Sequence, residues 1–521
     1  MKKRIVAVLM AAAMTMGLMA CGSSTSTSGD AAASSTGNSE SAAPTAEATA
    51  EATGPYDQVT FAYCTFNNIP TEEDLDVVEE QINVITREKI HAEITLMPIS
   101  IAEYSSKVSL ALQGGEKIDC FQSLGDFGNA ISTEMCLDIT DLYDQYCDAT
   151  AKTIPGPWLD ACMSNGRLYG IPTYKPVALT PMVIYREDLA QKAGVDMTAV
   201  NSLEDLTPVL EKVKAACPEI TPLAPVQTGT LGTEFTMKEI DYLCDDYYHP
   251  IGALIGDNFD VVDLYDSDEF RNLCATSREW YQKGLVMKDA ATTTSMAAEL
   301  MASGNYFCYV AAYSYPEKDT ALSLQAQLGT NPIGAKIIGD AYLSTTDINA
   351  LTWMVSSTSD VPEAAIKFLD LTMTDENIIN LVIYGIDGRD YVTLDDGSIL
   401  YPEGQDASTV PYTAALSCGT FGNFFLMKSM TGYNKDSLEW ELEQNQSAKT
   451  SPAMGFTFDS SALTTQYTAV NNVIAQYLPG LLCGSLDPET EIDAFIKALN
   501  DSGYKEILGA KQQQLNAWAG R

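Results

Sequence analysis

The sequence has few of the residues from which hydrolytic and metal-dependent sites are built. Only two histidines occur in 521 residues, His91 and His249, so a Ser-His-Asp triad is barely feasible and a multi-histidine metal site is excluded. The motifs GxSxG, GxxxxGK[ST] and HExxH are absent. Five aspartates between Asp257 and Asp268 lack calcium-loop spacing, and we interpret them as a solvated surface. We therefore expect no catalytic residues, no metal site and no cofactor.

Basic residues are also scarce. The chain has 30 Lys and Arg against 70 Asp and Glu, which gives a formal net charge of −40. Binding to a nucleic acid backbone draws on clustered Lys and Arg, so the charge argues against nucleic acid as a partner and equally against an anionic membrane surface. We interpret the acidity as a source of solubility outside the cell, and an acidic face for a cationic ligand is the alternative.

Cysteines are not paired in any CxxC or CxC motif. Twelve occur, and without Cys21 an odd number of eleven remains, scattered singly. Cys120, Cys244 and Cys308 lie in apolar runs, where cysteine acts as a small hydrophobic residue. We expect mostly free, buried thiols, although the pattern leaves room for one or two disulfides.

Long hydrophobic runs are confined to the N-terminus. Lys2 to Arg4 are basic, and the uncharged run from Ile5 to Ala20 is too short for a membrane span of about 20 residues, which is typical of a cleaved signal. Cys21, directly after Leu18-Met19-Ala20, resembles the lipid-modified cysteine of bacterial lipoproteins. An ordinary secretory signal with a chance cysteine is the alternative. The resemblance implies a diacylated Cys21 at the outer face of the cytoplasmic membrane.

Residues 22–54 are almost wholly Ser, Thr, Ala, Gly and acidic. Because they have no large apolar side chain to bury, they cannot offset the entropy of ordering, and we expect a flexible stalk between lipid and folded body.

After the stalk about 465 residues remain, which is too many for one ordinary core and suits two lobes. β-rich runs at 58–63, 92–98 and 118–123 alternate with helical patterns at 72–90 and 101–113. This alternation predicts a parallel sheet covered by helices. Ligands of such sheets bind beyond the carboxyl ends of the strands, so Thr65–Asn68 and Leu124–Phe127 are predicted cleft loops.

Turn and cap signals continue along the chain. Asn165-Gly166 predicts a hairpin, Ser202 the N-cap of a helix, and Pro362 the first turn of a helix that is interrupted near Thr374. Two amphipathic helices are predicted after Leu486, separated at Gly503.

Several of these segments resemble, in order and spacing, the extracellular solute-binding proteins of sugar ABC importers, in particular the larger lipoprotein branch of Gram-positive bacteria. The matching motifs are Gly166-Arg167-Leu168-Tyr169-Gly170-Ile171-Pro172, Arg186-Glu187-Asp188-Leu189, Ser202-Leu203-Glu204-Asp205-Leu206, Met301-Ala302-Ser303-Gly304-Asn305, VSSTSDVPEAAIKFL from Val355, Tyr384 to Tyr391, and Gly480 to Trp518.

The resemblance implies an α/β, two-lobed periplasmic-binding-protein-like fold of type II. Each lobe is expected to be a mainly parallel sheet flanked by helices, with hinges near 174–177, 342–350 and 391–402, where a closing motion is absorbed. The expected organisation is a signal peptide at 1–20, a stalk at 21–54, lobe 1 at 55–175 plus about 345–395, and lobe 2 at 176–344 plus about 396–521.

A sugar site needs aromatic platforms and polar hydrogen-bonding partners. The 26 Tyr, 15 Phe and 5 Trp supply the platforms. Candidates in predicted cleft loops or hinges are Phe66, Asn67, Asp126, Trp158, Tyr174, Tyr313, Trp353 and Phe456. For each of them the competing interpretation is packing in the core.

The resemblance implies a monomeric, lipid-anchored, extracellular receptor that is not an enzyme, captures a carbohydrate between its lobes and delivers it to the membrane subunits of an ABC permease. One alternative is a receptor for short peptides or polyamines, which the acidity favours. Another is a surface glycan hydrolase, because 70 acidic residues can supply two carboxylates even though nothing marks a pair. A purely structural lipoprotein is the third alternative.

Overall fold

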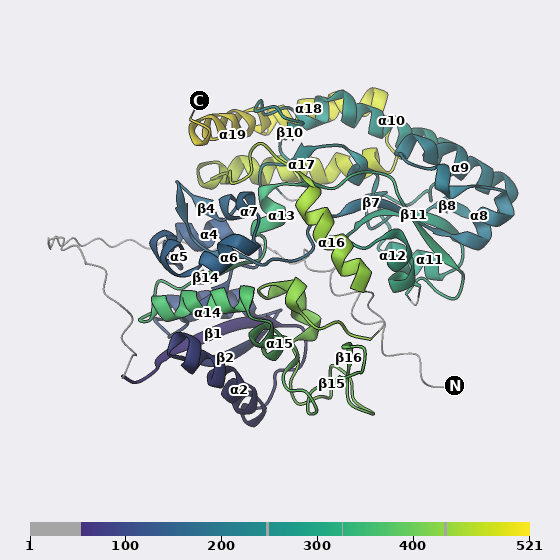
Figure 1. The fold of residues 1–521 in the computed structure, drawn as a ribbon. Coiled ribbons are helices and arrows are strands. Elements are labelled where there is room, and N and C mark those ends of the chain that lie inside the picture. Colours follow the sequence, from purple (N-terminus) through teal and green to yellow (C-terminus); the bar gives the residue numbers. More distant parts are fainter. Residues whose placement is uncertain (1–53, 246–248, 326, 432–434, 521) are drawn as a thin grey trace.

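The computed structural model describes residues 54–245, 249–325, 327–431 and 435–520. The predicted signal peptide, the lipidation of Cys21 and the stalk lie outside these residues. Two β-sheets form the centres of two lobes, seen at lower left and at right in Figure 1, and helix α16 (Lys435–Ser447) lies between them. Of the described helices, none is long and apolar enough to cross a membrane.

The first sheet has the strand order β2-β1-β3-β14-β6. β1 pairs in parallel with β2 and β3, whereas β14 is antiparallel to both β3 and β6. The strands are β1 (Asp57–Thr65), β2 (Ala92–Ser100), β3 (Cys120–Gln122), β14 (Thr352–Val355) and β6 (Ile171–Pro172). With helices α2 (Glu72–Ile90) and α3 (Tyr104–Gln113) between the first three strands, the predicted βαβαβ order is confirmed.

Helix α2 shows how the local sequence builds this lobe. Thr71 caps its N-terminus by accepting a hydrogen bond from the Asp74 amide, and the predicted buried stripe includes Val78 and Ile82. The carboxamide of Asn83 donates to the carbonyl of Ile94 (3.2 Å) and accepts from its amide (2.6 Å). This pair of bonds fixes the helix against β2.

Shorter elements extend the first lobe. Asn165 and Gly166 both have positive φ values, 51° and 73°, as a two-residue hairpin turn requires, so the predicted hairpin is confirmed between β4 (Met163–Ser164) and β5 (Arg167–Leu168). The helices are α4 (Phe127–Ser132), α5 (Thr140–Tyr146), α6 (Asp148–Thr153), α7 (Gly156–Asp160), α14 (Pro362–Thr374) and α15 (Glu376–Tyr384).

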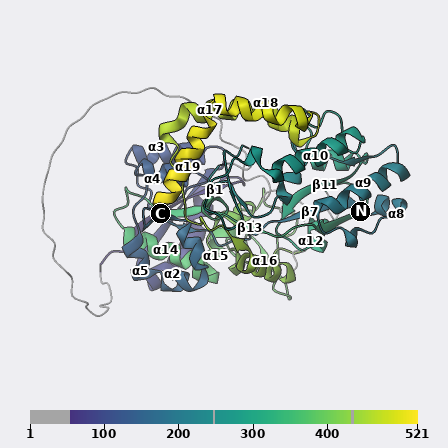
Figure 2. The ribbon, with the colours of Figure 1, turned by 90° about the horizontal axis from the view of Figure 1, so that it is seen from above.

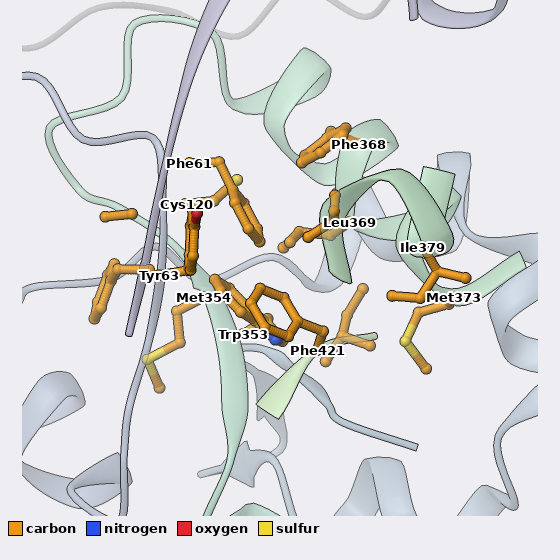
Figure 3. Close-up of a cluster of buried hydrophobic side chains, with 14 of the residues drawn as sticks. Phe61, Tyr63, Cys120, Trp353, Met354, Phe368, Leu369, Met373, Ile379 and Phe421 are labelled. Atoms are coloured by element: carbon orange, nitrogen blue, oxygen red, sulfur yellow. The ribbon is translucent and has the colours of Figure 1, made fainter. Parts of the chain in front are cut away.

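The core of the first lobe contains a cluster of aromatic rings, which is seen among the buried hydrophobic side chains in Figure 3. Trp353 stacks on Phe61 with ring centroids 4.4 Å apart, and the Phe61 ring meets Phe368 edge-on at 5.2 Å. Phe421 covers the other side of Trp353 at 6.2 Å. Rings from β1, α14, β14 and the segment after residue 413 therefore join four distant stretches of chain.

The second sheet has the order β12-β7-β11-β8. Its strands are β12 (Ile333–Ile337), β7 (Thr180–Arg186), β11 (Tyr306–Tyr313) and β8 (Thr221–Leu223). β7 is antiparallel to both of its neighbours, and only β11 and β8 are parallel. The α/β class is confirmed, but the prediction of a mainly parallel sheet in each lobe is wrong for this lobe, because β7 enters from the first lobe and runs against its neighbours.

Helices cover both faces of the second sheet. Val183 and Val310 face α8 (Glu187–Ala193) and α9 (Leu203–Ala216), and Ser202 caps α9 as predicted. Met182 and Tyr309 point to the opposite face, which is covered by α11 (Ala297–Ala302) and α12 (Glu317–Leu324).

A third layer of helices completes the chain. It consists of α10 (Asp268–Gln282), α17 (Thr464–Leu482), α18 (Pro488–Asp501) and α19 (Tyr504–Trp518), packed around Tyr265, Phe270 and Phe495. Seen from above in Figure 2 and from the side in Figure 1, α17 and α19 extend from the second lobe over the first.

Three segments run between the lobes: residues 173–179, residues 338–351, and the chain from α16 into α17. The second contains β13 (Tyr342–Leu343) and α13 (Thr345–Asn349), and β13 pairs with β17 (Lys449–Thr450) of the third. Helix α16 fixes the first crossing segment, residues 173–179, by hydrogen bonds. Its Asn445 Oδ1 accepts from the amides of Val177 (3.0 Å) and Ala178 (3.1 Å), while Nδ2 donates to the Lys175 carbonyl (2.7 Å).

Helix α16 also contacts both lobes. Leu438 and Leu442 pack against the first core, Ser437 Oγ donates to Asp319 Oδ2 (2.5 Å), and Glu441 Oε1 accepts from Ser314 Oγ (3.0 Å) of the second lobe. Residues after about 395 were expected in lobe 2. Buried side chains from Ile399 to Phe424 belong instead to the core of the first lobe. This stretch begins in the hairpin of β15 (Val392–Thr393) and β16 (Ile399–Leu400). The remaining lobe boundaries stay a prediction.

Candidate functional site

The strand directions place one edge of each sheet at the crossings between the lobes. In the first lobe β1, β2 and β3 end at this edge and β14 begins there. In the second lobe β7 begins at Thr180 directly after a crossing, so the end of antiparallel β11 at Tyr313 lies beside it. Because β8 is parallel to β11, the loop after Leu223 rises from this edge too. Loops beyond strand ends are where α/β proteins bind ligands.

Phe66, Asn67 and Asp126 lie at this edge of the first lobe, in the predicted loops. Phe66 is 39% exposed, and its backbone amide donates to Ser417 Oγ (3.0 Å). Asn67 Nδ2 donates to the Thr413 carbonyl (3.0 Å), and its Oδ1 is buried without a hydrogen-bond partner among the described residues. Asp126 is exposed and accepts from Asn129 Nδ2 (2.9 Å). The three side chains combine an apolar platform with polar groups.

Tyr313 is the one sequence candidate at the corresponding edge of the second lobe. It is half-buried, its hydroxyl lies 2.7 Å from that of Tyr309, and its carbonyl accepts from Thr180 Oγ1 (3.1 Å). Burial raises the pKa of Tyr313 to about 12, so the phenol stays protonated and able to donate or accept a hydrogen bond.

A cavity of about 270 Å³ lies beside the loop that follows β8; we call it the Glu234 cavity. Its walls are Gln227, Thr228, Gly229, Thr230, Glu234, Met237, Tyr242, His249, Pro250, Leu264, Tyr265, Phe270, Ile474, Ala475, Leu478, Pro479 and Leu482. Glu234 Oε1 accepts from the Thr230 hydroxyl, while Oε2 is buried with no partner within the described chain. Desolvation in this wall raises the pKa of Glu234 to about 7.

A second cavity, of about 230 Å³, shares His249 with the first; we call it the Asp245 cavity. Asp245 Oδ2 pairs with Lys511 Nζ at 2.6 Å, and Oδ1 accepts from the Tyr467 hydroxyl (3.2 Å). Leu243 and Cys244, in its wall, have consecutive positive φ values of 54° and 73°. Such strain in residues other than glycine costs of the order of 1 kcal/mol each and clusters at functional sites.

The other four sequence candidates are enclosed by the fold. Trp158 and Tyr174 meet edge-on at 5.2 Å, and Tyr174 contacts Phe425 in the same way at 5.1 Å. Trp353 is 2% exposed and donates its indole N–H to the Thr420 carbonyl (2.8 Å).

Phe456, the fourth, is buried against Trp518. All four side chains stabilise the core in this conformation, so their roles in binding stay predictions that the packing does not favour.

Comparison with known families shows to which family the chain belongs. Residues 82–398 match the bacterial extracellular solute-binding protein family, and residues 452–520 match a domain of unknown function, DUF3502. The chain belongs to the bacterial extracellular solute-binding proteins. The sequence-based identification of the family is therefore confirmed, and with it the expectation of a binding protein that is not an enzyme.

Individual relatives of this solute-binding protein are distant but cover nearly its whole length. A carbohydrate ABC transporter substrate-binding protein of Streptococcus pneumoniae is 24% identical over 98% of this chain and 97% of its own. The crystal structure of the N-glycan transport solute-binding protein NgtS, also from S. pneumoniae, aligns with a TM-score of 0.72 at 21% identity, over 88% of this chain and 98% of that one.

An HMO-binding, ABC-transporter-associated solute-binding protein of Bifidobacterium longum infantis aligns with a TM-score of 0.61 at 15% identity, over 89% of this chain and 99% of its own. The two-lobed fold is confirmed by these structures.

Sequence reasoning missed the residues around the two cavities. Thr230, Glu234 and Tyr242 carry no motif, and the available signal was the loop Gln227-Thr228-Gly229-Thr230 after a short strand of the second lobe. His249 lines both cavities of this solute-binding protein.

Neither a cluster of metal-ligating side chains nor a disulfide is found among the described residues. Within the described ranges no three His, Cys, Asp or Glu side chains cluster as metal ligands. All eleven cysteines after Cys21 are free, and all except Cys244 are buried, as expected of small core residues.

Proposed function

We propose that this solute-binding protein is the receptor of a carbohydrate ABC importer. It captures an oligosaccharide between its two lobes and presents it to the permease subunits, held at the extracellular face of the membrane by a lipid on Cys21. The protein acts as a monomer.

The match over nearly the whole chain to a carbohydrate ABC transporter substrate-binding protein carries this proposal. The fold of NgtS, which has also been solved in complexes with Man1GlcNAc and Man5GlcNAc, supports an oligosaccharide over a single sugar. The described surface adds the chemistry that sugars need, with an exposed ring at Phe66 and hydrogen-bonding groups at Asn67, Asp126 and Tyr313.

A ligand between the lobes would lie on two surfaces. The loops at Phe66 and Asp126 form the surface of the first lobe. Tyr313 and the polar loop 227–230, with the cavities beside it, form that of the second. Contacts to both lobes are what allow a ligand to favour a closed state, since a ligand shifts such an equilibrium only by its difference in affinity for the two states.

The test is a thermal-shift screen of the folded body from residue 54 onward. The probes are mannose-containing N-glycan fragments, milk oligosaccharides, alginate and fructan oligosaccharides, short peptides and polyamines. A ligand that binds only the folded state raises stability by RT ln(1 + [L]/Kd), or about 2.7 kcal/mol at 100 times Kd. We expect a shift from one glycan class, and mass spectrometry should recover that glycan intact.

The same screen separates the alternatives. A shift from spermidine or peptides with silence across the glycans would contradict a carbohydrate receptor and would favour the cationic ligand that a net charge of −40 attracts. Recovery of shortened glycans would indicate a hydrolase.

The anchor is tested separately in cells of a Gram-positive host. Cys21→Ala removes the thiol that carries the lipid, so the protein should move from the membrane fraction to the medium, whereas Cys64→Ala, a buried thiol of the folded body, should leave it in the membrane fraction. Unchanged fractionation of Cys21→Ala would contradict the lipid anchor.

A further inference from the structure

The carboxyl group of Glu234 has an unusual environment. It is 5% exposed and lies in a cavity wall that contains no Lys or Arg among the described residues. Buried carboxyl groups normally have a cation or several donors, because an unpaired buried charge is costly. Thr230 satisfies Oε1, and Oε2 remains without a partner in the part of the chain described. Such an atom calls for an explanation, and its position in a cavity wall makes it a candidate contact for a ligand.

The part of the cavity wall that α17 and α10 provide is apolar, whereas Gln227, Thr228, Thr230, Tyr242 and His249 add polar groups elsewhere. The apolar lining residues include Ile474, Leu478 and Leu482 of α17 and Phe270 of α10. Tyr265 also lines the cavity, and its hydroxyl donates a hydrogen bond to the Pro250 carbonyl (2.8 Å). The fitting chemical group therefore has one hydrogen-bonding end and one apolar end. Where the wall is formed by α17 and α10, the hydroxyl groups of a sugar ring would find no side-chain hydrogen-bonding partner.

The cavity is accessible and small. Ala475 lines it and is exposed on α17, and Gln227 to Thr230 belong to the loop at the edge between the lobes. Its volume of about 270 Å³ is near the lower end of small-molecule sites, roughly 300–1,000 Å³. It can hold one sugar ring or its substituent but not an oligosaccharide.

We propose that the Glu234 cavity is a subsite for the acetamido group of an N-acetylated sugar residue, and that Glu234 selects such residues. The inference rests on the proposed carbohydrate receptor and adds a substrate class to it. The amide of the acetamido group presents an N–H donor and a carbonyl acceptor in one plane, which matches a carboxyl group, and its methyl group packs against Ile474 and Leu478.

The protonation behaviour of Glu234 agrees with this assignment. Its pKa of about 7 means that the carboxyl group is about half protonated at neutral pH, so Oε2 can either donate to the carbonyl of the acetamido group or accept from its N–H. A cation is not needed to stabilise the site.

The test compares N,N′-diacetylchitobiose with cellobiose by isothermal titration calorimetry. These disaccharides share ring and linkage and differ in having an acetamido group or a hydroxyl group at C2. We expect the wild-type protein to bind diacetylchitobiose at least tenfold more tightly than cellobiose. Glu234→Leu, which removes the polar end of the subsite, and Ala475→Phe, which blocks its exposed mouth, should each reduce that preference to less than twofold.

Gln476→Phe is the matched control, because residue 476 is the exposed neighbour of Ala475 on α17 and does not line the cavity. It should keep the wild-type preference. Ala475→Phe changes an exposed position, so it tests the subsite even where Glu234→Leu fails to fold. Equal binding of the two disaccharides by the wild type, or an undiminished preference in Ala475→Phe, overturns the subsite. Binding of other glycans in that case leaves the carbohydrate receptor standing, whereas silence across all glycans contradicts both.

Discussion

Glu234→Gln should make the stability of the folded body less dependent on pH. The substitution keeps the shape and the acceptor for Thr230 but removes the titrating group. In the folded state the pKa of Glu234 is about 7, against an ordinary value of 4.5. This difference corresponds to about 3 kcal/mol, at 1.36 kcal/mol for each pH unit.

The sign follows from which state releases its proton first. Below pH 4.5 Glu234 is protonated in both states and contributes no pH dependence. Between pH 4.5 and about 7 the unfolded chain releases the proton while the folded protein retains it, so the wild type loses up to about 3 kcal/mol relative to acidic solution. Above pH 7 both states are ionised and the loss is constant. The advantage of Glu234→Gln should therefore grow from pH 4.5 to pH 8 and then level off.

Thermal unfolding at several pH values measures this advantage. An unfolding entropy of about 2.1 cal/mol/K per residue gives about 1 kcal/mol/K for about 465 residues, so 3 kcal/mol corresponds to an increase in Tm of about 3 °C. Glu88→Gln, at an exposed position of α2, controls for the loss of one charge from an acidic protein. A Tm difference between Glu234→Gln and wild type that stays constant from pH 4.5 to 8 would refute the placement of an unpaired carboxyl group in this cavity.

Three further substitutions test the hinge, the core and the cleft. Asn445→Ala leaves the buried amides of Val177 and Ala178 without an acceptor, and urea unfolding should show a loss of about 2–4 kcal/mol, whereas no loss would mean that α16 does not hold the crossing. Trp353→Phe removes the bond to the Thr420 carbonyl and should cost about 1 kcal/mol of stability with glycan affinity unchanged, so a tenfold weaker affinity would move Trp353 into the binding site. Phe66→Ala should change stability by less than about 0.5 kcal/mol and weaken glycan binding about tenfold in calorimetry, and an unchanged Kd would remove this ring from the cleft.

Much of the fold was predictable because it is encoded locally. The βαβαβ start, the hairpin at Asn165-Gly166 and the cap at Ser202 depend on periodicity and turn chemistry within a few residues, and all three are found. The direction of β7 depends on how the chain enters the second lobe, which no local pattern contains.

The site was less predictable. Loop position correctly placed Phe66, Asn67 and Asp126 at the strand ends, yet aromatic character alone could not distinguish a cleft residue from Trp353, whose ring stacks in the core. Glu234 is one of 70 acidic residues, and its distinction is a buried Oε2 without a hydrogen-bond partner among the described residues, which depends on how distant segments such as α17 pack beside it.

Helix α16 opposes a rotation of the two lobes relative to each other. Its side chains at Ser437 and Glu441 bond to Asp319 and Ser314 of the second lobe, while its apolar face packs on the first. A rotation of the lobes that α16 follows with the first must break both hydrogen bonds. At about 1.5 kcal/mol for a bond to a charged group, the pair contributes about 3 kcal/mol, or a population ratio of roughly a hundredfold. The affinity that a sugar shows in solution then depends on this bias as well as on its contact energy, so substitutions of Ser437 or Glu441, which lie outside the proposed ligand surface, can tune the receptor.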